Sequence, residues 1–387
     1  MAAAVTFGLG RVPGERGRRP LGPAPPASPR KVYGPWTAGR RMPRAAAAGL
    51  ERMRALAGDL PNALLQGFRA GVEQKLTVAA AERPVYAAGI GGSAVAADLA
   101  VGLVEAEASV PLVVVRSGEL PRAVGPGVTV VVVSYSGTTK EALEAYATAG
   151  RRNARRVVVT SGGTLAEEAD RDGVPVLLVP GGNPPRSAVG HLFGGVLGLL
   201  DPVFSESNER RVEIAADELR REIPRLGSSR GPAAALAAGI GPRRPLVLAE
   251  RSFAPLARRW KTQLEENAKR LASFDELPEF LHNAVVGWDA LPRREAAGHA
   301  VVTLEWSAEA PSARQAARYV HRLARSRGAR ALTAALPAED RLSATVYGIA
   351  LGDFVSLDLA RRDRVDPYRI AAIERARTAL ASASDDD

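Results

Sequence analysis

Four serine and threonine hydroxyls surround one glycine in the segment Ser134-Tyr135-Ser136-Gly137-Thr138-Thr139. The segment follows an apolar run at 129–133 and precedes a stretch with helical spacing. One hydroxyl is enough to cap a helix, whereas a phosphate dianion needs several donors, backbone N–H groups and the positive end of a helix dipole. We therefore interpret this segment as part of a phosphate-binding site.

A second turn of this kind, Gly91-Gly92-Ser93, follows the apolar run at 85–90. Taken alone it also fits a tight strand-to-helix turn in which Ser93 is the N-cap. Neither turn contains the Gly-Lys-Ser/Thr of a P-loop or the three-glycine spacing of a dinucleotide site. Together we interpret the two turns as the floor of a sugar-phosphate site.

Arg186 lies in Asn183-Pro184-Pro185-Arg186-Ser187, between a predicted strand and an apolar helical stretch. A structural explanation is that proline is common at the first position of a helix. A functional explanation is that the Arg186 guanidinium is placed to stabilise an oxyanion. On these residues alone both explanations stay open.

Glu266 lies in a predicted helix beside Glu265 and Lys269, whose i, i+4 spacing is typical of a solvated ion pair. Glu266 is one step round the helix from that pair, where it could point inward. His282 precedes an apolar stretch, a setting in which histidine is more often structural than catalytic. The other histidines, His191, His299 and His321, are assigned no role.

The elements that must position these residues alternate along the chain. The first half contains predicted strands at 85–90, 112–116, 129–134, 157–160 and 174–179, with helices at 94–105, 140–150, 165–170 and 187–200. After a charged helix at 210–222, strands follow at 246–249, 301–306 and 331–336, with helices at 255–271, 313–325, 341–360 and 370–380. This alternation predicts an α/β fold with two parallel sheets, each flanked by helices on both faces, and ligands beyond the carboxyl ends of the strands.

We predict three parts of the chain. Residues 1–50 form an N-terminal extension that is either disordered or not translated, with Met42 or Met53 as alternative starts. Residues 51–226 form the first α/β domain, which opens with one or two helices at 53–77 and carries the phosphate-binding turns. Residues 227–387 form the second domain, which ends in a C-terminal helix.

Composition narrows the possible functions. There is no cysteine, which excludes disulfides and thiolate chemistry, and the four histidines lack metal-ligand spacing. The formal net charge is +10, but residues 1–44 contribute +8 of it, so we do not expect nucleic-acid binding by the folded part. No apolar run reaches the ~18 residues of a membrane span, and we expect a cytoplasmic protein.

In order and spacing, these segments resemble the bifunctional phosphoglucose/phosphomannose isomerase family, whose members contain two SIS (sugar isomerase) domains. The matching segments are Gly89-Ile90-Gly91-Gly92-Ser93, Ser134-Tyr135-Ser136-Gly137-Thr138-Thr139, Pro185-Arg186-Ser187, Glu266-Asn267-Ala268-Lys269 and Pro278-Glu279 with His282-Asn283. The likeness runs from about residue 83 to the C-terminus.

The resemblance implies an aldose–ketose isomerase that interconverts glucose 6-phosphate and mannose 6-phosphate with fructose 6-phosphate. The reaction would pass through a cis-enediol(ate) without metal or cofactor, in a homodimer. The implied roles are phosphate binding by Gly92, Ser93, Ser134, Ser136 and Thr139, proton transfer between C1 and C2 by Glu266, enediolate stabilisation by Arg186, and ring opening by His282 of the neighbouring subunit.

One segment departs from the family's pattern. The family commonly places a threonine shortly after an Asp/Asn-Pro near the C-terminus, whereas Val365-Asp366-Pro367 here runs into Tyr368-Arg369-Ile370. Tyr368 is the candidate replacement for that hydroxyl. Two other functions stay open: a non-catalytic SIS regulator that binds sugar phosphates, and an amino-sugar-phosphate isomerase.

Overall fold

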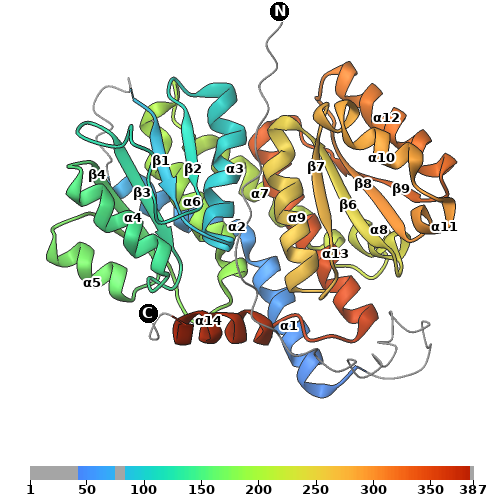
Figure 1. Ribbon diagram of the computed structural model, residues 1–387, viewed down its shortest axis with the longest axis horizontal. Coiled ribbons are helices and arrows are strands. Elements are labelled where there is room, and N and C mark those ends of the chain that lie inside the picture. Colours follow the sequence, from blue (N-terminus) through green and yellow to red (C-terminus); the bar gives the residue numbers. More distant parts are fainter. Residues whose placement is uncertain (1–41, 75–82, 384–387) are drawn as a thin grey trace, which may run out of the picture. The chain divides into compact units, whose positions relative to one another are not determined.

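The computed structural model describes residues 42–74 and 83–383, all within the unit Arg41–Asp387 (Figure 1). The chain enters through two helices, α1 (Arg44–Gly58) and α2 (Leu60–Glu73). The predicted N-terminal extension falls largely outside the described residues, but 44–50 lie in α1 and bury Ala46 and Leu50. Apolar side chains at helical spacing explain why this helix starts earlier than position 53.

The first sheet has strand order β2-β1-β3-β4-β5, and all its strands are parallel. Its strands are β1 (Val85–Ala88), β2 (Leu112–Val115), β3 (Thr129–Ser134), β4 (Arg155–Thr160) and β5 (Val176–Leu178). Its helices are α3 (Gly92–Glu107), α4 (Lys140–Arg151), α5 (Thr164–Arg171) and α6 (Val189–Leu200), the last preceded by the 3-10 turn η1 (Pro185–Ala188). These elements match the predicted alternation.

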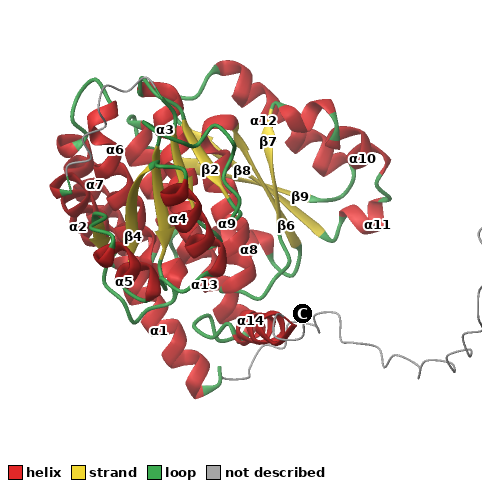
Figure 2. Cartoon of the chain, turned by 60° about the vertical axis from the view of Figure 1, so that its left-hand side comes forward, coloured by secondary structure: helices red, strands yellow, loops and turns green. Residues whose placement is uncertain are grey.

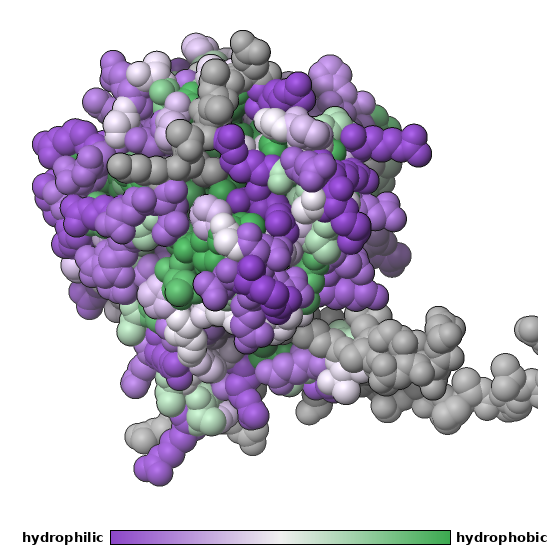
Figure 3. All heavy atoms as spheres, turned by 90° about the vertical axis from the view of Figure 1, so that its left-hand side faces the viewer, coloured by the Kyte–Doolittle hydropathy of each residue, from purple (hydrophilic) through white to green (hydrophobic). Residues whose placement is uncertain are grey.

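Both faces of this sheet are buried, which the continuous apolar runs predicted. Along β3, Val131 and Val133 pack toward α3 and α6, whereas Val130 and Val132 pack toward α4 and α5. Figure 2 shows the strands of this sheet lying between helices. The face shown in Figure 3 is mainly hydrophilic, with smaller hydrophobic areas, one of them near its centre.

The second sheet repeats the arrangement in the order β7-β6-β8-β9, again all parallel. Its strands are β6 (Arg244–Glu250), β7 (Ser273–Leu277), β8 (His299–Trp306) and β9 (Arg330–Leu336). The helices of this half are α7 (Glu209–Leu226), α8 (Pro232–Ile240), α9 (Ala254–Glu266), α10 (Ala284–Ala290), α11 (Arg293–Ala296), α12 (Pro311–Ser326), α13 (Arg341–Asp363) and α14 (Ala371–Ala383). The two halves share a strand order, although we find no direct sequence repeat. The predicted domain boundary at 226/227 falls between α7 and α8, and it stays a prediction.

One apolar core lies between the two sheets, and α3 packs against α9 within it. The helix α13 is long and apolar enough to cross a membrane by composition, but that entire stretch is buried in the fold. Burial on all sides is the expected setting of a core helix that is hydrophobic all round.

Five second-half elements differ from the prediction, and two of them are the short helices α10 and α11, which were not predicted. The edge strand β7 was missed because Ser273-Phe274-Asp275-Glu276-Leu277 has no apolar run and only its last residue is fully buried. The helix α8 was also missed. The predicted helix at 255–271 instead ends at Glu266, because Lys269 takes the left-handed conformation with φ +57°.

Candidate active site

The hydroxyl-rich turn forms a connected cluster at the carboxyl end of β3. Ser134 Oγ donates a hydrogen bond of 3.2 Å to Thr139 Oγ1, and Ser136 Oγ lies 3.4 Å from the same atom. Thr139 is the N-cap residue of α4, yet its side chain makes no capping hydrogen bond. The Thr139 hydroxyl is thus not used to cap the helix, and the cluster lies beside the free N–H groups of a helix N-terminus.

Gly137 makes this turn possible. It has φ +67°, and a Cβ atom there would lie 1.7 Å from the carbonyl oxygen of Gly162. Any side chain would therefore push the turn away from the loop after β4.

The turn after β1 meets the turn after β3. Ser93 Oγ accepts a 3.0 Å hydrogen bond from the backbone N–H of Tyr135. The N-cap of α3 is Gly91, so Ser93 is not the cap residue that its position suggested. Because the chain leaves β1 toward β2 and later returns to β3 on the other side, this is the switch point of the sheet, where ligands of such folds bind.

Arg186 lies directly beside the turn after β1. A Cβ atom on Gly92 would be 3.5 Å from the backbone nitrogen of Arg186, so the two main chains run close together. The Arg186 side chain is buried, with 3% of its surface exposed. Burial lowers the pKa of the Arg186 guanidinium, while the Glu266 carboxylate acts in the opposite direction.

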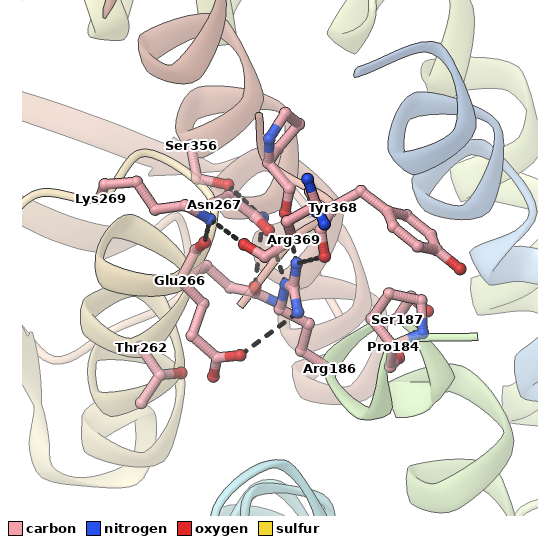
Figure 4. A network of polar contacts seen from close by, with 12 residues as sticks. Pro184, Arg186, Ser187, Thr262, Glu266, Asn267, Lys269, Ser356, Tyr368 and Arg369 are labelled. Atoms are coloured by element: carbon pink, nitrogen blue, oxygen red, sulfur yellow. Dashed lines mark hydrogen bonds and ion pairs between the residues drawn. The ribbon is translucent and has the colours of Figure 1, made fainter. Parts of the chain in front are cut away.

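Glu266 meets Arg186 although the two residues belong to different halves of the chain. The Arg186 NH1 group lies 3.4 Å from Glu266 Oε2, and a quarter of the Glu266 side chain (25%) is exposed (Figure 4). Glu266 is the last residue of α9, and its side chain points back along the helix, so that its carboxylate lies near Thr262 (Figure 4). The predicted inward orientation of this residue agrees with the geometry. The predicted pairing of Glu265 with Lys269 is wrong, because Glu265 pairs with Lys261 at 2.7 Å.

Asn267 orients the guanidinium, a role that the sequence did not reveal. Its Oδ1 accepts a 2.7 Å hydrogen bond from Arg186 Nε, and its Nδ2 donates to Ser356 Oγ at 2.9 Å. Asn267 is 1% exposed. A buried amide with both ends bonded holds its partner in one orientation.

Two further contacts come from the C-terminal segment. The NH2 group of Arg186 donates to the carbonyl oxygens of Pro367 and Tyr368, the latter at 3.2 Å. The Tyr368 ring packs under the Arg52 guanidinium, 4.6 Å from it, and Figure 4 shows the ring pointing away from the Glu266 carboxylate. The suggestion that Tyr368 supplies the missing hydroxyl is therefore not supported by its orientation.

His282 is not brought to this cluster within the chain. It ends the 3-10 turn η4 (Glu279–His282) and is exposed. Among the described residues, no hydrogen bond or ion pair joins His282 to Arg186 or Glu266. The following helix α10 has no buried residue, and Val286 on it is 70% exposed.

The switch point of the second sheet is acidic, and its hydroxyl groups on Ser252 and Thr303 donate to carboxylates. Glu250 and Glu305 lie near the ends of β6 and β8, and Glu309 is buried close by. Burial, reinforced by Glu305, raises the pKa of Glu309 to about 7. Carboxylates disfavour a phosphate dianion, so of the two switch points the first is the one suited to it. Within the described ranges, no group of three or more His, Cys, Asp or Glu residues is arranged to hold a metal ion.

Solved structures place the fold among the phosphosugar isomerases. A hypothetical protein from Thermus thermophilus matches with TM-score 0.68 and 15% identity, over 87% of this chain and 94% of the other. The tagatose-6-phosphate ketose/aldose isomerase of Escherichia coli matches with TM-score 0.60 and 17% identity, over 82% and 95%. At such identities the likeness concerns the fold alone.

Sequence comparison identifies the family to which the chain belongs. The bacterial phospho-glucose isomerase C-terminal SIS domain matches residues 229–380. The bifunctional phosphoglucose/phosphomannose isomerase of Caldicellulosiruptor bescii is 31% identical over 60% of this chain and 70% of its own length. The D-glucosamine-6-phosphate 4-epimerase of Sulfolobus acidocaldarius is 33% identical, but over 41% of this chain and 50% of its own length. The chain belongs to the bifunctional phosphoglucose/phosphomannose isomerase family.

Proposed function

We propose that this protein is a sugar-phosphate isomerase that interconverts glucose 6-phosphate and mannose 6-phosphate with fructose 6-phosphate. The observation that carries the proposal is the 3.4 Å approach of the Arg186 guanidinium to the Glu266 carboxylate, beside the turn that contains Gly92. Family membership supports the substrate class.

The proposed mechanism begins with the phosphate bound by neighbouring backbone N–H groups and by the predicted set Gly92, Ser93, Ser134, Ser136 and Thr139. Once the sugar ring is open, Glu266 removes the proton on the carbon next to the carbonyl and returns it to the adjacent carbon. The C–H electron pair becomes the C1–C2 double bond of a cis-enediolate, and negative charge develops on oxygen. The buried Arg186 guanidinium lies where it would stabilise that charge, so the proposed chemistry needs no metal ion.

An isomerase that accepts both glucose 6-phosphate and mannose 6-phosphate needs space around C2 in which the enediolate can rotate. Glucose and mannose differ in configuration at C2, and the planar enediolate is common to both. A single carboxylate acts from one side, so rotation about a neighbouring bond must present either face of C2 to it. The substrate is held at its phosphate end during this step.

The proposal includes a homodimer in which His282 of each subunit assists ring opening in the other. The exposed imidazole beside the unburied helix α10 supports a subunit contact at this surface. We also propose a cytoplasmic location, which the lack of cysteine fits.

The test is a coupled assay of the purified protein with fructose 6-phosphate, which scores glucose 6-phosphate and mannose 6-phosphate separately, with and without a chelator. We expect both products and no effect of the chelator. A second candidate is favoured by the epimerase relative: activity on an amino-sugar phosphate. A parallel assay with glucosamine 6-phosphate decides between the two isomerase activities. Binding of these sugar phosphates without turnover would favour a non-catalytic SIS regulator.

A further inference from the structure

Three consecutive backbone carbonyls near the C-terminus are bonded by two cationic side chains. Arg186 NH2 donates to the oxygens of Pro367 and Tyr368, and Lys269 Nζ donates to the oxygen of Arg369 at 2.7 Å. We call residues 366–369 the strap segment. Its carbonyls meet both cations at one side of the Glu266 carboxylate (Figure 4).

Lys269 also bonds the residue that we propose as the base. Its Nζ donates to the backbone carbonyl oxygen of Glu266. One ammonium group thus joins the end of α9 to the strap segment. The far side of the Arg186 guanidinium is fixed by Asn267, which leaves NH1 directed at Glu266.

The backbone at Lys269 also indicates that its side chain is needed. Its φ of +57° lies in the left-handed region, which costs a residue with a Cβ atom roughly 1 kcal/mol. Glycine would avoid that cost. A lysine at such a position keeps an ammonium group at the end of α9, where the carbonyl end of the helix dipole favours positive charge.

We propose that Lys269 is a positioning residue of the isomerase site: its ammonium group ties the strap segment to the end of α9 and so fixes the direction in which Arg186 faces Glu266. This inference rests on the proposed function. It assigns the C-terminal segment a role in orienting the guanidinium through backbone oxygens.

The charge on Lys269 is sensitive to alkaline pH. Partial desolvation of the ammonium group and then the nearby Arg186 lower the pKa of Lys269 to about 8, although the residue as a whole is exposed, while Asp366 and Glu266 oppose the shift. Arg186 faces the ammonium group from η1, Asp366 from the strap segment and Glu266 from the end of α9. Above that pH the neutral amine holds the strap carbonyl more weakly, because a charge-assisted hydrogen bond is lost.

The test compares wild type with Lys269→Gly, Lys269→Arg and the control Lys261→Met. Glycine removes the ammonium group without backbone strain, whereas arginine keeps the charge at every accessible pH. Lys261 lies within α9 and pairs with Glu265 instead of with the strap segment. We expect Lys269→Gly to lower kcat by about tenfold or more with KM changed less than about threefold. The Lys269→Arg variant should recover part of kcat and shift the alkaline decline in kcat to higher pH.

Hydrogen–deuterium exchange of peptides that cover 368–370 gives a readout that does not depend on turnover. We expect faster exchange in Lys269→Gly, and in wild type above pH ~8 after correction for the intrinsic rate, with Lys261→Met unchanged. The inference would be overturned if Lys269→Gly showed the same exchange rate and the same pH profile of kcat as wild type. It would also be overturned if the loss of activity in Lys269→Gly only followed a lower Tm. If wild type isomerised no sugar phosphate, the proposed function would fail, whereas the exchange data would still decide the role of Lys269.

Discussion

The guanidinium of Arg186 faces the carboxylate of Glu266 across 3.4 Å, although 80 residues separate them in the chain. Arg186 follows the last strand of the first sheet, and Glu266 ends the helix that follows the first strand of the second sheet. Each half of the duplicated fold therefore contributes one charged group to a site that neither half contains alone.

Glu266→Gln removes the proposed base while it keeps the size of the side chain. We expect kcat to fall by ~10³ or more, because a positioned proton acceptor is lost. Steady-state kinetics with fructose 6-phosphate measure the change. The matched control is Glu265→Gln, the neighbouring residue that pairs with Lys261, which should keep near-normal kcat. Similar rates in both variants would refute the assignment of Glu266.

Arg186→Ala should reduce kcat more than it raises KM, since the contact with the enediolate is strongest in the transition state. It also leaves Asn267 Oδ1 and two strap carbonyls without their donor, so we expect a loss of about 1–3 kcal/mol in the free energy of unfolding. Kinetics and chemical denaturation check the two effects. Arg251→Ala is the control, because that side chain is 70% exposed and pairs with Glu105. A larger effect on KM than on kcat would contradict the proposed role.

Thr139→Val replaces a hydroxyl by a methyl group of similar size at the start of α4. This hydroxyl makes no capping bond but accepts a hydrogen bond from the buried Ser134, so its loss should weaken phosphate binding and lower the free energy of unfolding by about 1 kcal/mol. We expect KM to rise about tenfold, with a parallel rise in the inhibition constant of inorganic phosphate. Thr148→Val, near the other end of α4, serves as control. An unchanged inhibition constant would remove Thr139 from the phosphate site.

His282→Ala and Glu266→Gln should complement each other if the site is shared between subunits. A mixed dimer of the two inactive variants contains one site with both changes and one site with neither. Random exchange of subunits makes about half of the dimers mixed, so about a quarter of wild-type activity should return. Activity measured after dissociation and reassociation of a 1:1 mixture tests this. No recovery despite confirmed exchange would place His282 outside the neighbouring site.

Glu309→Gln should stabilise the protein at high pH and have little effect at low pH. Burial raises the pKa of Glu309 from 4.5 to about 7, so the folded state holds a proton that the unfolded state has released. Stability is therefore lost as pH rises from 4.5 through 7, by up to about 3 kcal/mol from 1.36 kcal/mol per pKa unit. Glutamine has no proton to lose. Thermal unfolding at pH 5 and pH 8 checks the difference, with the exposed Glu51→Gln as control. An equal gain at both values would contradict the ionisation argument.

Much of this fold could be predicted from local patterns. Apolar runs such as 129–133 must be covered on both faces, and their alternation with helical stretches leaves a parallel sheet as the simple solution. The hydroxyl-rich turn after β3 was also predictable, because Gly137 and four serine and threonine hydroxyls occur within six residues. These features depend on neighbours in the chain, so the sequence alone determined them, together with membership of the family.

The tertiary structure decided which groups meet. Periodicity shows which face of a helix is buried, but it does not show which distant element covers that face. From the sequence, Lys269 therefore looked like the partner of Glu265. In the structure the helix ends at Glu266, and the Lys269 ammonium group donates to the backbone oxygen of Arg369. The orientation of Arg186 depends on Asn267 and on carbonyls of the strap segment, and backbone carbonyls carry no sequence signal. That convergence arises because long-range packing brings the C-terminal segment to the end of α9.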